Sequence, residues 1–196
     1  MKRQLFIVAD MFRSLWRNKS EQKTLYLEEI GWTMTVPPEL RILSEKQVQG
    51  LVNKSAKNHH TPFDLKNPDK DHGKVAMARN FEGSYLLVHL YPTANRCAAE
   101  IREEFQKLRI LAAEKQQRSH AAYSRVRVED SLHSGTIGQI SFDRIEVITR
   151  IPGRILSWLY IYHTVYKGYV LYISIGFRNA SFGHRLLDHM EGSVFC

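Results

Sequence analysis

Short runs of apolar and β-branched residues alternate with turn residues near the start of the chain. Residues 24–28 and 32–36 form two such runs, and the three residues between them include Gly31. A connection of this length is typical of a β-hairpin. Pro37 and Pro38 come next, and proline cannot donate a hydrogen bond to a strand ladder. The pattern therefore predicts a hairpin that ends at residue 36.

A helical pattern follows, and after it a polar segment. Ser44 and Gln47 have the spacing of a capping box, in which each side chain bonds the backbone of the other residue. Apolar residues then recur at intervals of three and four, which predicts a helix over residues 45–58. Residues 58–73 are polar and contain two prolines, so we expect a long surface loop there.

The middle of the chain predicts a second hairpin and the longest helix. Residues 74–81 and 84–91 are strand-like and flank a turn at Gly83. Residues 96–117 have apolar positions on one face and charged positions on the other, which is typical of an amphipathic helix. The predicted apolar face consists of Ile101, Phe105, Leu108, Leu111 and Ala112.

The last third of the chain is predicted to be mainly strand. β-Branched and aromatic residues are enriched there, and Pro152-Gly153 and Lys167-Gly168 supply the turns. The expected strands span residues 124–128, 138–151, 154–163 and 168–177. A short helix over residues 183–192 is expected to point Leu186, Leu187 and Met190 inward.

This order of elements determines the predicted fold class. Consecutive hairpins with helices inserted between them favour an antiparallel sheet over a doubly wound parallel one. We therefore predict an α+β fold in which helices flank an antiparallel β-sheet as an α/β/α sandwich. A chain of 196 residues, 43% of them hydrophobic, can build the core of one such domain. We place this domain at residues 24–196, behind a basic N-terminal arm at residues 1–23 that we expect to be partly flexible.

The net charge of +8 is concentrated in two segments. Residues 1–23 carry six Lys and Arg against two acidic residues, and Arg102 to Arg127 carry seven against three. Nucleic acid or an anionic lipid surface could bind such segments. A solvated helix face and tail is the alternative, and we favour it because no nucleic-acid motif accompanies the charge. The seven cations of the second segment are Arg102, Lys107, Arg109, Lys115, Arg118, Arg125 and Arg127.

The two cysteines and the N-terminus bear on the cellular compartment. Cys97 and Cys196 are not in a metal or disulfide spacing. Cys97 begins a predicted helix, where the pKa of a thiol can fall, but its alanine neighbours favour simple packing. We expect Cys196 to be a loose terminal thiol.

The charged and apolar start of the chain resembles a secretory signal, yet Asp10 interrupts the apolar run. No run approaches the roughly 18 apolar residues that cross a bilayer. We predict a cytoplasmic protein, whether it starts at Met1 or at Met11.

Several stretches resemble PsbP-like proteins in their order. The first is LYLEEIGWTMTVP at residues 25–37, a hairpin with an aromatic residue after glycine and a proline at the strand end. A polar helix follows, then the strand pair NFEGSYLLVHLYP, a long amphipathic helix, the strand IGQISFDRIEV, and the strand KGYVLYISIGFRN before a short terminal helix. The resemblance covers residues 24–195 and is one of element order and texture.

The resemblance implies a central antiparallel sheet flanked by helices. PsbP-like proteins include an extrinsic subunit of the photosynthetic water-oxidising complex, a nuclear import factor that binds a small GTPase, an envelope lipoprotein needed for phage uptake, and many uncharacterised bacterial proteins. They do not resemble enzymes with shared active-site residues. The resemblance therefore implies binding, and it assigns no catalytic, cofactor or metal residue in this chain.

Two groups of polar side chains carry recognisable chemistry. In the predicted loop at residues 58–73, Asp69-x-Asp71-x-Gly73 resembles part of a calcium loop, but the third acidic ligand and the closing glutamate are missing. We therefore expect a solvated loop; its imidazoles and carboxylates are His59, His60, Asp64, Asp69, Asp71 and His72. His184 and Asp188 stand four residues apart on the last predicted helix. They could act as a base and its orienting carboxylate, although a surface hydrogen bond is the commoner use of such a pair.

Aromatic residues of the last strands offer a third possibility. Trp158, Tyr160, Tyr162, His163 and Tyr172 could form a platform on which bases or sugars stack. Side chains alternate between the faces of a strand, so half of them must point inward. We expect most of these residues to belong to the core and its rim.

Three functional hypotheses remain. We predict a non-enzymatic binding or scaffold module that has a protein partner and needs no cofactor or metal. The alternative is a basic-patch binder of nucleic acid or anionic lipid, which would use the arm and the segment from Arg102 to Arg127. A hydrolase that uses His184 and Asp188 is the second alternative, but no established nucleophile or phosphate-binding motif supports it.

Overall fold

The computed structural model describes residues 23–44, 46–48, 50–51, 74–93 and 96–196. All statements on structure below concern these residues. The predicted basic arm, apart from Lys23, and the predicted histidine and aspartate loop lie outside them. The helix predicted over residues 45–58 is helical at residues 46–48 and 50–51, and its second half also lies outside the described ranges.

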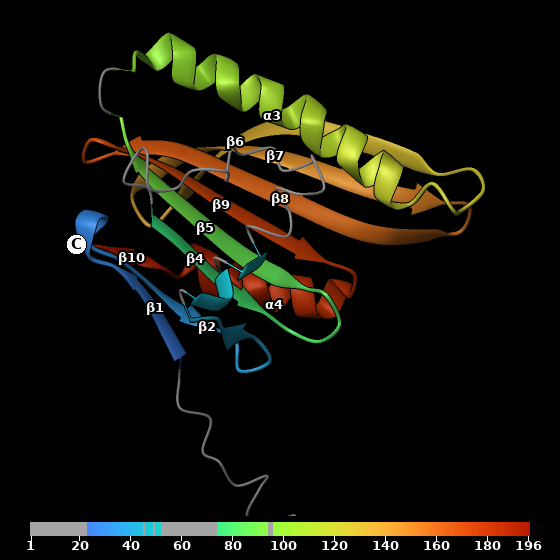
Figure 1. Ribbon diagram of the computed structural model, residues 1–196, viewed down its shortest axis with the longest axis horizontal. Helices are drawn as coiled ribbons and strands as arrows, with labels where there is room; N and C mark the ends of the chain where they lie inside the picture. Colours follow the sequence, from blue (N-terminus) through green and yellow to red (C-terminus); the bar gives the residue numbers. More distant parts are fainter. Residues whose placement is uncertain (1–22, 45, 49, 52–73, 94–95) are drawn as a thin grey trace, which may run out of the picture.

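A seven-stranded antiparallel sheet forms the centre of the molecule (Figure 1). Its strands β6 to β9 follow one another along the chain and pair as successive hairpins. In sheet order the strands are β3 (Arg41–Ile42), β4 (Lys74–Arg79), β5 (Tyr85–Pro92), β9 (Tyr169–Phe177), β8 (Arg154–Tyr166), β7 (Ile140–Ile151) and β6 (Arg127–Ile137).

The turn between β8 and β9 shows how local sequence sets the register. Lys167 and Gly168 both have positive φ angles, 48° and 78°. Two consecutive residues of this kind make the tight turn whose twist matches that of the strands it joins. Tyr166 therefore pairs directly with Tyr169.

A smaller antiparallel sheet lies beside the large one. It contains β1 (Lys23–Leu27), β2 (Trp32–Val36) and β10 (Val194–Phe195), with β2 in the middle. The short 3₁₀ helix η1 (Glu28–Ile30) connects β1 to β2. The predicted first hairpin is confirmed, and the end of the described chain adds its third strand.

One helix covers each face of the large sheet, as Figure 1 shows. Helix α3 (Ala98–Ser119) lies over β6 and β7, and its buried residues Ile101, Phe105 and Leu108 join the core on that side. Helix α4 (Ala180–Glu191) packs on the opposite face against β9 and the small sheet. The predicted α+β class, an antiparallel sheet between helices, is confirmed.

Several predicted boundaries were wrong for physical reasons. Strand β6 extends to Ile137, whereas the prediction ended it at residue 128. The prediction missed this part because β6 is an edge strand whose residues 129–136 are mostly exposed and polar, so they show no apolar alternation. Helix α4 begins three residues early, because the Asn179 side chain accepts a hydrogen bond from the Phe182 amide and caps it. Leu111, predicted to lie on the apolar face of α3, is 44% exposed.

Candidate functional site

Two hollows meet at one turn on the surface of the molecule. Their volumes are about 360 and 370 Å³, and both are lined by Glu39, Asn80 and Phe81. We call this continuous depression the Phe81 cleft. Its other charged or aromatic walls are formed by Arg41, Arg79, Glu82, Phe182 and Arg185. The β2–β3 connection, the β4–β5 turn and the start of α4 thus build the cleft together.

The β4–β5 turn presents Phe81 to solvent in a defined position. The Asn80 amide donates to the Ser84 carbonyl oxygen at 3.0 Å, and the Ser84 amide donates to the Asn80 side-chain oxygen at 2.9 Å. Gly83 has a φ of 85°, which suits glycine in a tight turn. Ser84 is buried while Phe81 is fully exposed. The turn therefore holds a large aromatic ring out of the core by its own hydrogen bonds.

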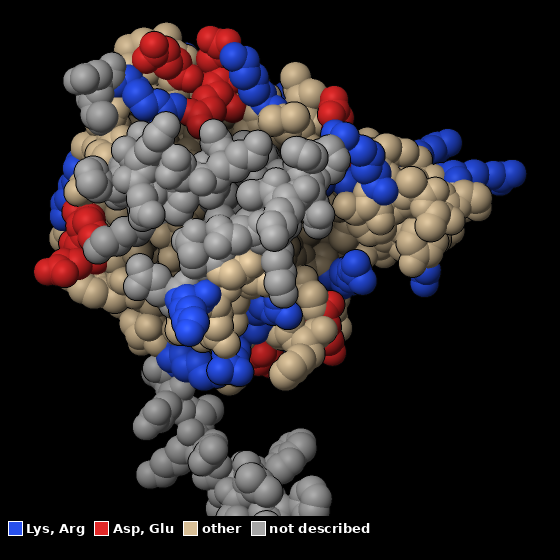
Figure 2. Space-filling view, in the orientation of Figure 1, with Lys and Arg blue, Asp and Glu red and all other residues tan. Residues whose placement is uncertain are grey.

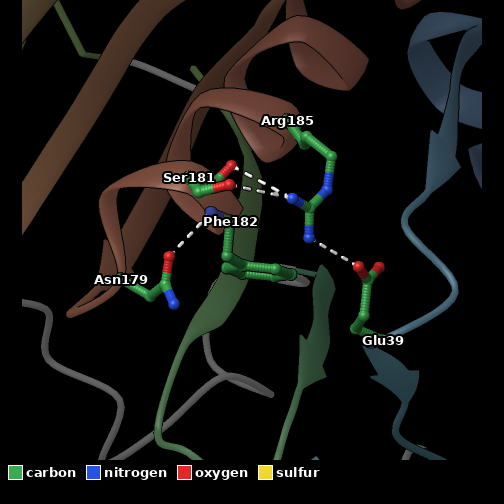
Figure 3. Close-up of polar contacts among 5 residues, drawn as sticks. All are labelled: Glu39, Asn179, Ser181, Phe182 and Arg185. Atoms are coloured by element: carbon green, nitrogen blue, oxygen red, sulfur yellow. Dashed lines mark hydrogen bonds and ion pairs between the residues drawn. The ribbon is translucent and has the colours of Figure 1, made fainter.

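One side of the cleft is built on the first turn of α4 (Figure 3). The Arg185 guanidinium donates to Glu39 at 2.7 Å, and its other terminal nitrogen lies 3.2 Å from the Ser181 hydroxyl. The same guanidinium lies 5.8 Å from the centre of the Phe182 ring. The pKa of Glu39 is lowered mainly by a main-chain hydrogen bond; desolvation opposes this effect, and the hydrogen bond and charge of Arg185 add to it. This ion pair joins the β2–β3 connection to α4.

The other side of the cleft carries two basic groups without acidic partners. Arg41 and Arg79 are directly opposite each other in the β3–β4 ladder, so their side chains leave the sheet on the same face. Both are exposed and both line the cleft. Neither forms an ion pair within the part of the chain that the structure describes. Glu39, an acidic residue of the opposite wall, is already paired with Arg185.

The alternative catalytic pair on α4 does not assemble, and the commoner surface hydrogen bond does not form either. His184 and Asp188 are both exposed on α4, and no hydrogen bond or ion pair joins them. In the described ranges there is also no group of three or more His, Cys, Asp or Glu side chains that could hold a metal ion. The predicted loop with His59, His60, Asp64, Asp69, Asp71 and His72 lies outside these ranges.

The predicted aromatic platform is divided between the two faces of the sheet. Trp158 and Tyr160 stack on Phe177 at 5.3 and 5.8 Å, and Tyr162 belongs to the same core on the α4 face. His163 and Tyr172 lie on the α3 face, where both contact Phe105. A single stacking surface is therefore excluded for these five residues, as the alternation of side chains along β8 requires.

The basic segment is partly neutralised by its own helix. Lys107 pairs with Glu103 at 2.6 Å and Arg118 with Glu114 at 2.9 Å, while Arg109 pairs with Asp130 of β6. Figure 2 shows acidic and basic side chains mixed along the top of the visible face, over α3. Basic side chains without acidic neighbours project at the right-hand end of that view. The segment is thus not a uniform basic stripe.

Both cysteines differ from their expected settings. Cys97 is exposed at the start of α3 rather than packed, and its amide donates to the Glu100 carboxylate at 2.8 Å. The thiol of Cys196 is exposed too, but the residue is not loose, because its amide donates to the Gly31 carbonyl oxygen at 3.0 Å. The alanines beside Cys97 face solvent as well.

Sequence reasoning missed the residues that build the Phe81 cleft. Arg41 lies on a strand of two residues, which is too short to give a periodic pattern. Arg79 and Phe81 were both predicted to lie in the strand at residues 74–81, whereas β4 ends at Arg79, and only the β3–β4 pairing brings the two arginines together. The one signal in the sequence was an aromatic residue inside a polar turn, Asn80 to Ser84.

Comparison with solved structures finds a similar fold. No protein-family model matches the sequence, and no curated protein matches it. A solution structure of cyanobacterial PsbP (CyanoP) from Synechocystis sp. PCC 6803 aligns with 89% of this chain and 92% of that chain, at a TM-score of 0.49 and 5% sequence identity. At this level the similarity carries neither a function nor a set of binding residues to this chain.

Within the described ranges, no helix combines the length and the apolar character needed to span a membrane.

Proposed function

We propose that the protein is a non-enzymatic binding module that holds an acidic segment of a protein partner in the Phe81 cleft. One observation carries the proposal: Arg41 and Arg79 are opposed and exposed beside a fully exposed Phe81, and neither pairs with an acidic residue of the described ranges. Like charges directly opposite on neighbouring strands destabilise a sheet. A bound carboxylate would replace this repulsion by charge-assisted hydrogen bonds, which are stronger than neutral ones.

The chemistry of the cleft suits a protein segment. Arginine and aromatic side chains are the residues enriched at the energetic centres of protein interfaces. Phe81 offers apolar area on a turn that is already hydrogen-bonded, so its ordering costs little on binding. The Glu39–Arg185 ion pair joins the other wall to α4. An acidic segment with an apolar side chain near its carboxylates would match both kinds of wall.

Site-specific photo-crosslinking in the native cell tests the proposal. The photoreactive residue p-benzoyl-phenylalanine replaces Phe81 in one variant and the exposed Tyr26 of β1 in a control variant. We expect a discrete protein adduct from position 81 only, attached to an acidic segment that mass spectrometry identifies. Arg41→Glu combined with Arg79→Glu should remove this adduct, since it turns attraction for carboxylates into repulsion. The matched control, Arg102→Glu combined with Arg125→Glu, makes the same charge change away from the cleft and should leave it.

The same variants distinguish this proposal from the alternative that the surface binds a polyanion. Phosphate-driven binding weakens steeply as salt is raised and tolerates many sequences. If position 81 gives no protein adduct while a labelled single-stranded oligonucleotide or anionic vesicles bind through Arg41 and Arg79, the basic-patch alternative replaces our proposal. Equal loss of the adduct in both double variants would also contradict it, because the cleft would then have no special part in binding.

A further inference from the structure

A third hollow lies on the opposite face of the large sheet from α4, beside the second half of α3. Its volume is about 380 Å³, within the range of pockets that hold small molecules. It is bounded by α3, by β5, β8 and β9, and by the short helical segment that includes Val48. We call it the α3 cavity. It borders the Phe81 cleft at Leu51, which lines both.

Most of the wall of the α3 cavity is apolar. Leu87 comes from β5, Leu159 and Ile161 come from β8, and Met77 of β4 and Ala112 of α3 extend the same surface. Tyr85 adds its ring, and desolvation raises the pKa of its hydroxyl to about 12, so the group stays neutral. This wall suits the hydrocarbon part of a ligand.

Polar groups gather where α3 ends. Gln116 accepts hydrogen bonds from the Thr149 and Ser157 hydroxyls at 3.4 and 3.3 Å through its side-chain oxygen. Gln116 lines the cavity, and within the described ranges its side-chain amide nitrogen donates no hydrogen bond. Ser174 of β9 also lines the cavity. Gln116 is held on α3 and Ser174 on β9.

Two basic side chains line the same cavity without acidic partners. Lys115 and Arg178 form no ion pair within the described ranges. Lys115 is exposed as a residue, yet desolvation lowers the pKa of its ammonium group. The last turn of a helix ordinarily disfavours an anion because its carbonyl oxygens are unpaired. Here the His120 ring donates to the Gln116 carbonyl oxygen at 3.0 Å and occupies it.

We propose that the α3 cavity binds a small amphipathic carboxylate. Its hydrocarbon part would lie against Leu87, Leu159 and Ile161, and its carboxylate would accept hydrogen bonds from Lys115, Arg178 and the Gln116 amide. The proposal adds a small-molecule site to the protein-binding cleft and does not depend on it. A partner in the cleft and a ligand in the cavity would both contact Leu51.

Isothermal titration calorimetry with sodium octanoate tests the proposal, with 1-octanol as the uncharged comparison of the same chain length. We expect one saturable octanoate site per chain and weaker binding of octanol by at least fivefold. Lys115→Met combined with Arg178→Met should weaken octanoate by at least fivefold and leave octanol unchanged. The control Lys107→Met removes a lysine from the same helix outside the cavity and should leave both unchanged.

A cavity-filling variant separates this site from adventitious binding. Ser174→Leu should weaken octanoate and octanol alike, since it occupies the cavity itself. If this variant does not fold, Ser119→Trp at the exposed rim replaces it. Equal affinity for octanoate and octanol, an equal effect of Lys107→Met, or no saturable heat at all would each overturn the proposal. Arg41→Glu with Arg79→Glu should leave octanoate binding intact even if the cleft binds no protein.

Discussion

The two faces of the large sheet are packed with different chemistry. Beneath α4 and the small sheet the buried side chains are mostly apolar, with Trp32, Met34 and Leu186 completely buried, although Tyr162 and Ser193 are buried there too. Beneath α3, buried His163, Tyr172 and Thr149 share the core with isoleucine, leucine and valine. Hydrocarbon packing is tolerant of pH, whereas buried polar groups are costly unless they have partners. The α4 face therefore mainly stabilises the fold, and the α3 face contains groups that can bind protons or ligands.

His163 shows the cost on the α3 face most clearly. Its ring stacks on Phe105 at 4.6 Å and lies 4.9 Å from the Tyr172 ring. Neither ring nitrogen has a hydrogen-bond partner within the described residues. Burial is the main reason that the pKa of His163 is lowered to about 4; Asp143 raises this pKa and Arg96 lowers it by smaller amounts. The imidazole is therefore neutral in the folded protein at ordinary pH.

The largest effect is expected from the α4 face. Trp32→Ala should lower the free energy of unfolding by about 3–5 kcal/mol, because it leaves a large cavity. It also removes the indole that donates to the Ser193 hydroxyl at 2.8 Å. Urea unfolding followed by circular dichroism measures the change. Trp32→Phe keeps most of the packing and should cost less; equal costs for the two variants would mean that packing at Trp32 does not dominate this face.

Acid should destabilise the protein through buried histidines on the α3 face. The pKa values of His163 and His89 are lowered by burial to about 4 from about 6.5 in an unfolded chain. Between these values the unfolded chain binds more protons, so stability must fall as pH falls from about 6.5 to about 4. Each histidine can contribute roughly 3 kcal/mol over that window. Urea midpoints measured at pH 7 and pH 4.5 check this expectation.

His163→Phe is the matched variant for the acid experiment. It keeps a ring beside Phe105 and removes the titrating group, so part of the loss of stability between pH 7 and pH 4.5 should disappear. An unchanged pH dependence would show that His163 is not one of the groups responsible.

A smaller effect is expected where α3 meets polar groups of the sheet. Gln116→Ala leaves the Thr149 and Ser157 hydroxyls without their acceptor. Losing the partner of a buried hydroxyl costs about 1–3 kcal/mol, and the long bonds here place the cost near the lower end. Thermal unfolding measures it against Gln117→Ala, an exposed neighbour on the same helix. Similar melting temperatures for the two variants would show that the Gln116 hydrogen bonds do not stabilise the α3 face.

The smallest expected effect concerns the start of α4. Asn179→Ala removes the side-chain oxygen that accepts from the Phe182 amide at 3.1 Å. Loss of such a cap costs about 1 kcal/mol. Asn179→Asp keeps an acceptor in place and should restore the stability measured by urea unfolding. If Asp is no better than Ala, the hydrogen bond is not what holds this end of the helix.

The sequence predicted the elements that have a strong hydrophobic period and missed those defined by pairing. Helix α3 and strands β7 to β9 follow from spacing and turn residues, and each was placed within a few residues. Strands β3 and β10 have only two residues each and exist because a neighbouring strand pairs with them. Strand β6 has an open edge and no apolar alternation.

The candidate site was less predictable than the fold for the same reason. Arg41 and Arg79 stand 38 positions apart in the sequence and meet only through the β3–β4 ladder. Gln116 and Ser157 meet only because α3 lies across β8. No local pattern marks such encounters, whereas His184 and Asp188, which a local pattern did mark, do not bond each other.

The small sheet also has a consequence for the order in which the protein folds. Trp32 and Ser193, which bond each other across it, are separated by 161 positions. Closing so long a loop is entropically costly before other contacts exist, whereas strands β6 to β9 can zip together as neighbouring hairpins. We therefore expect the β6–β9 hairpins to form first in refolding, and the fluorescence change of Trp32 to belong to a later, slower kinetic phase.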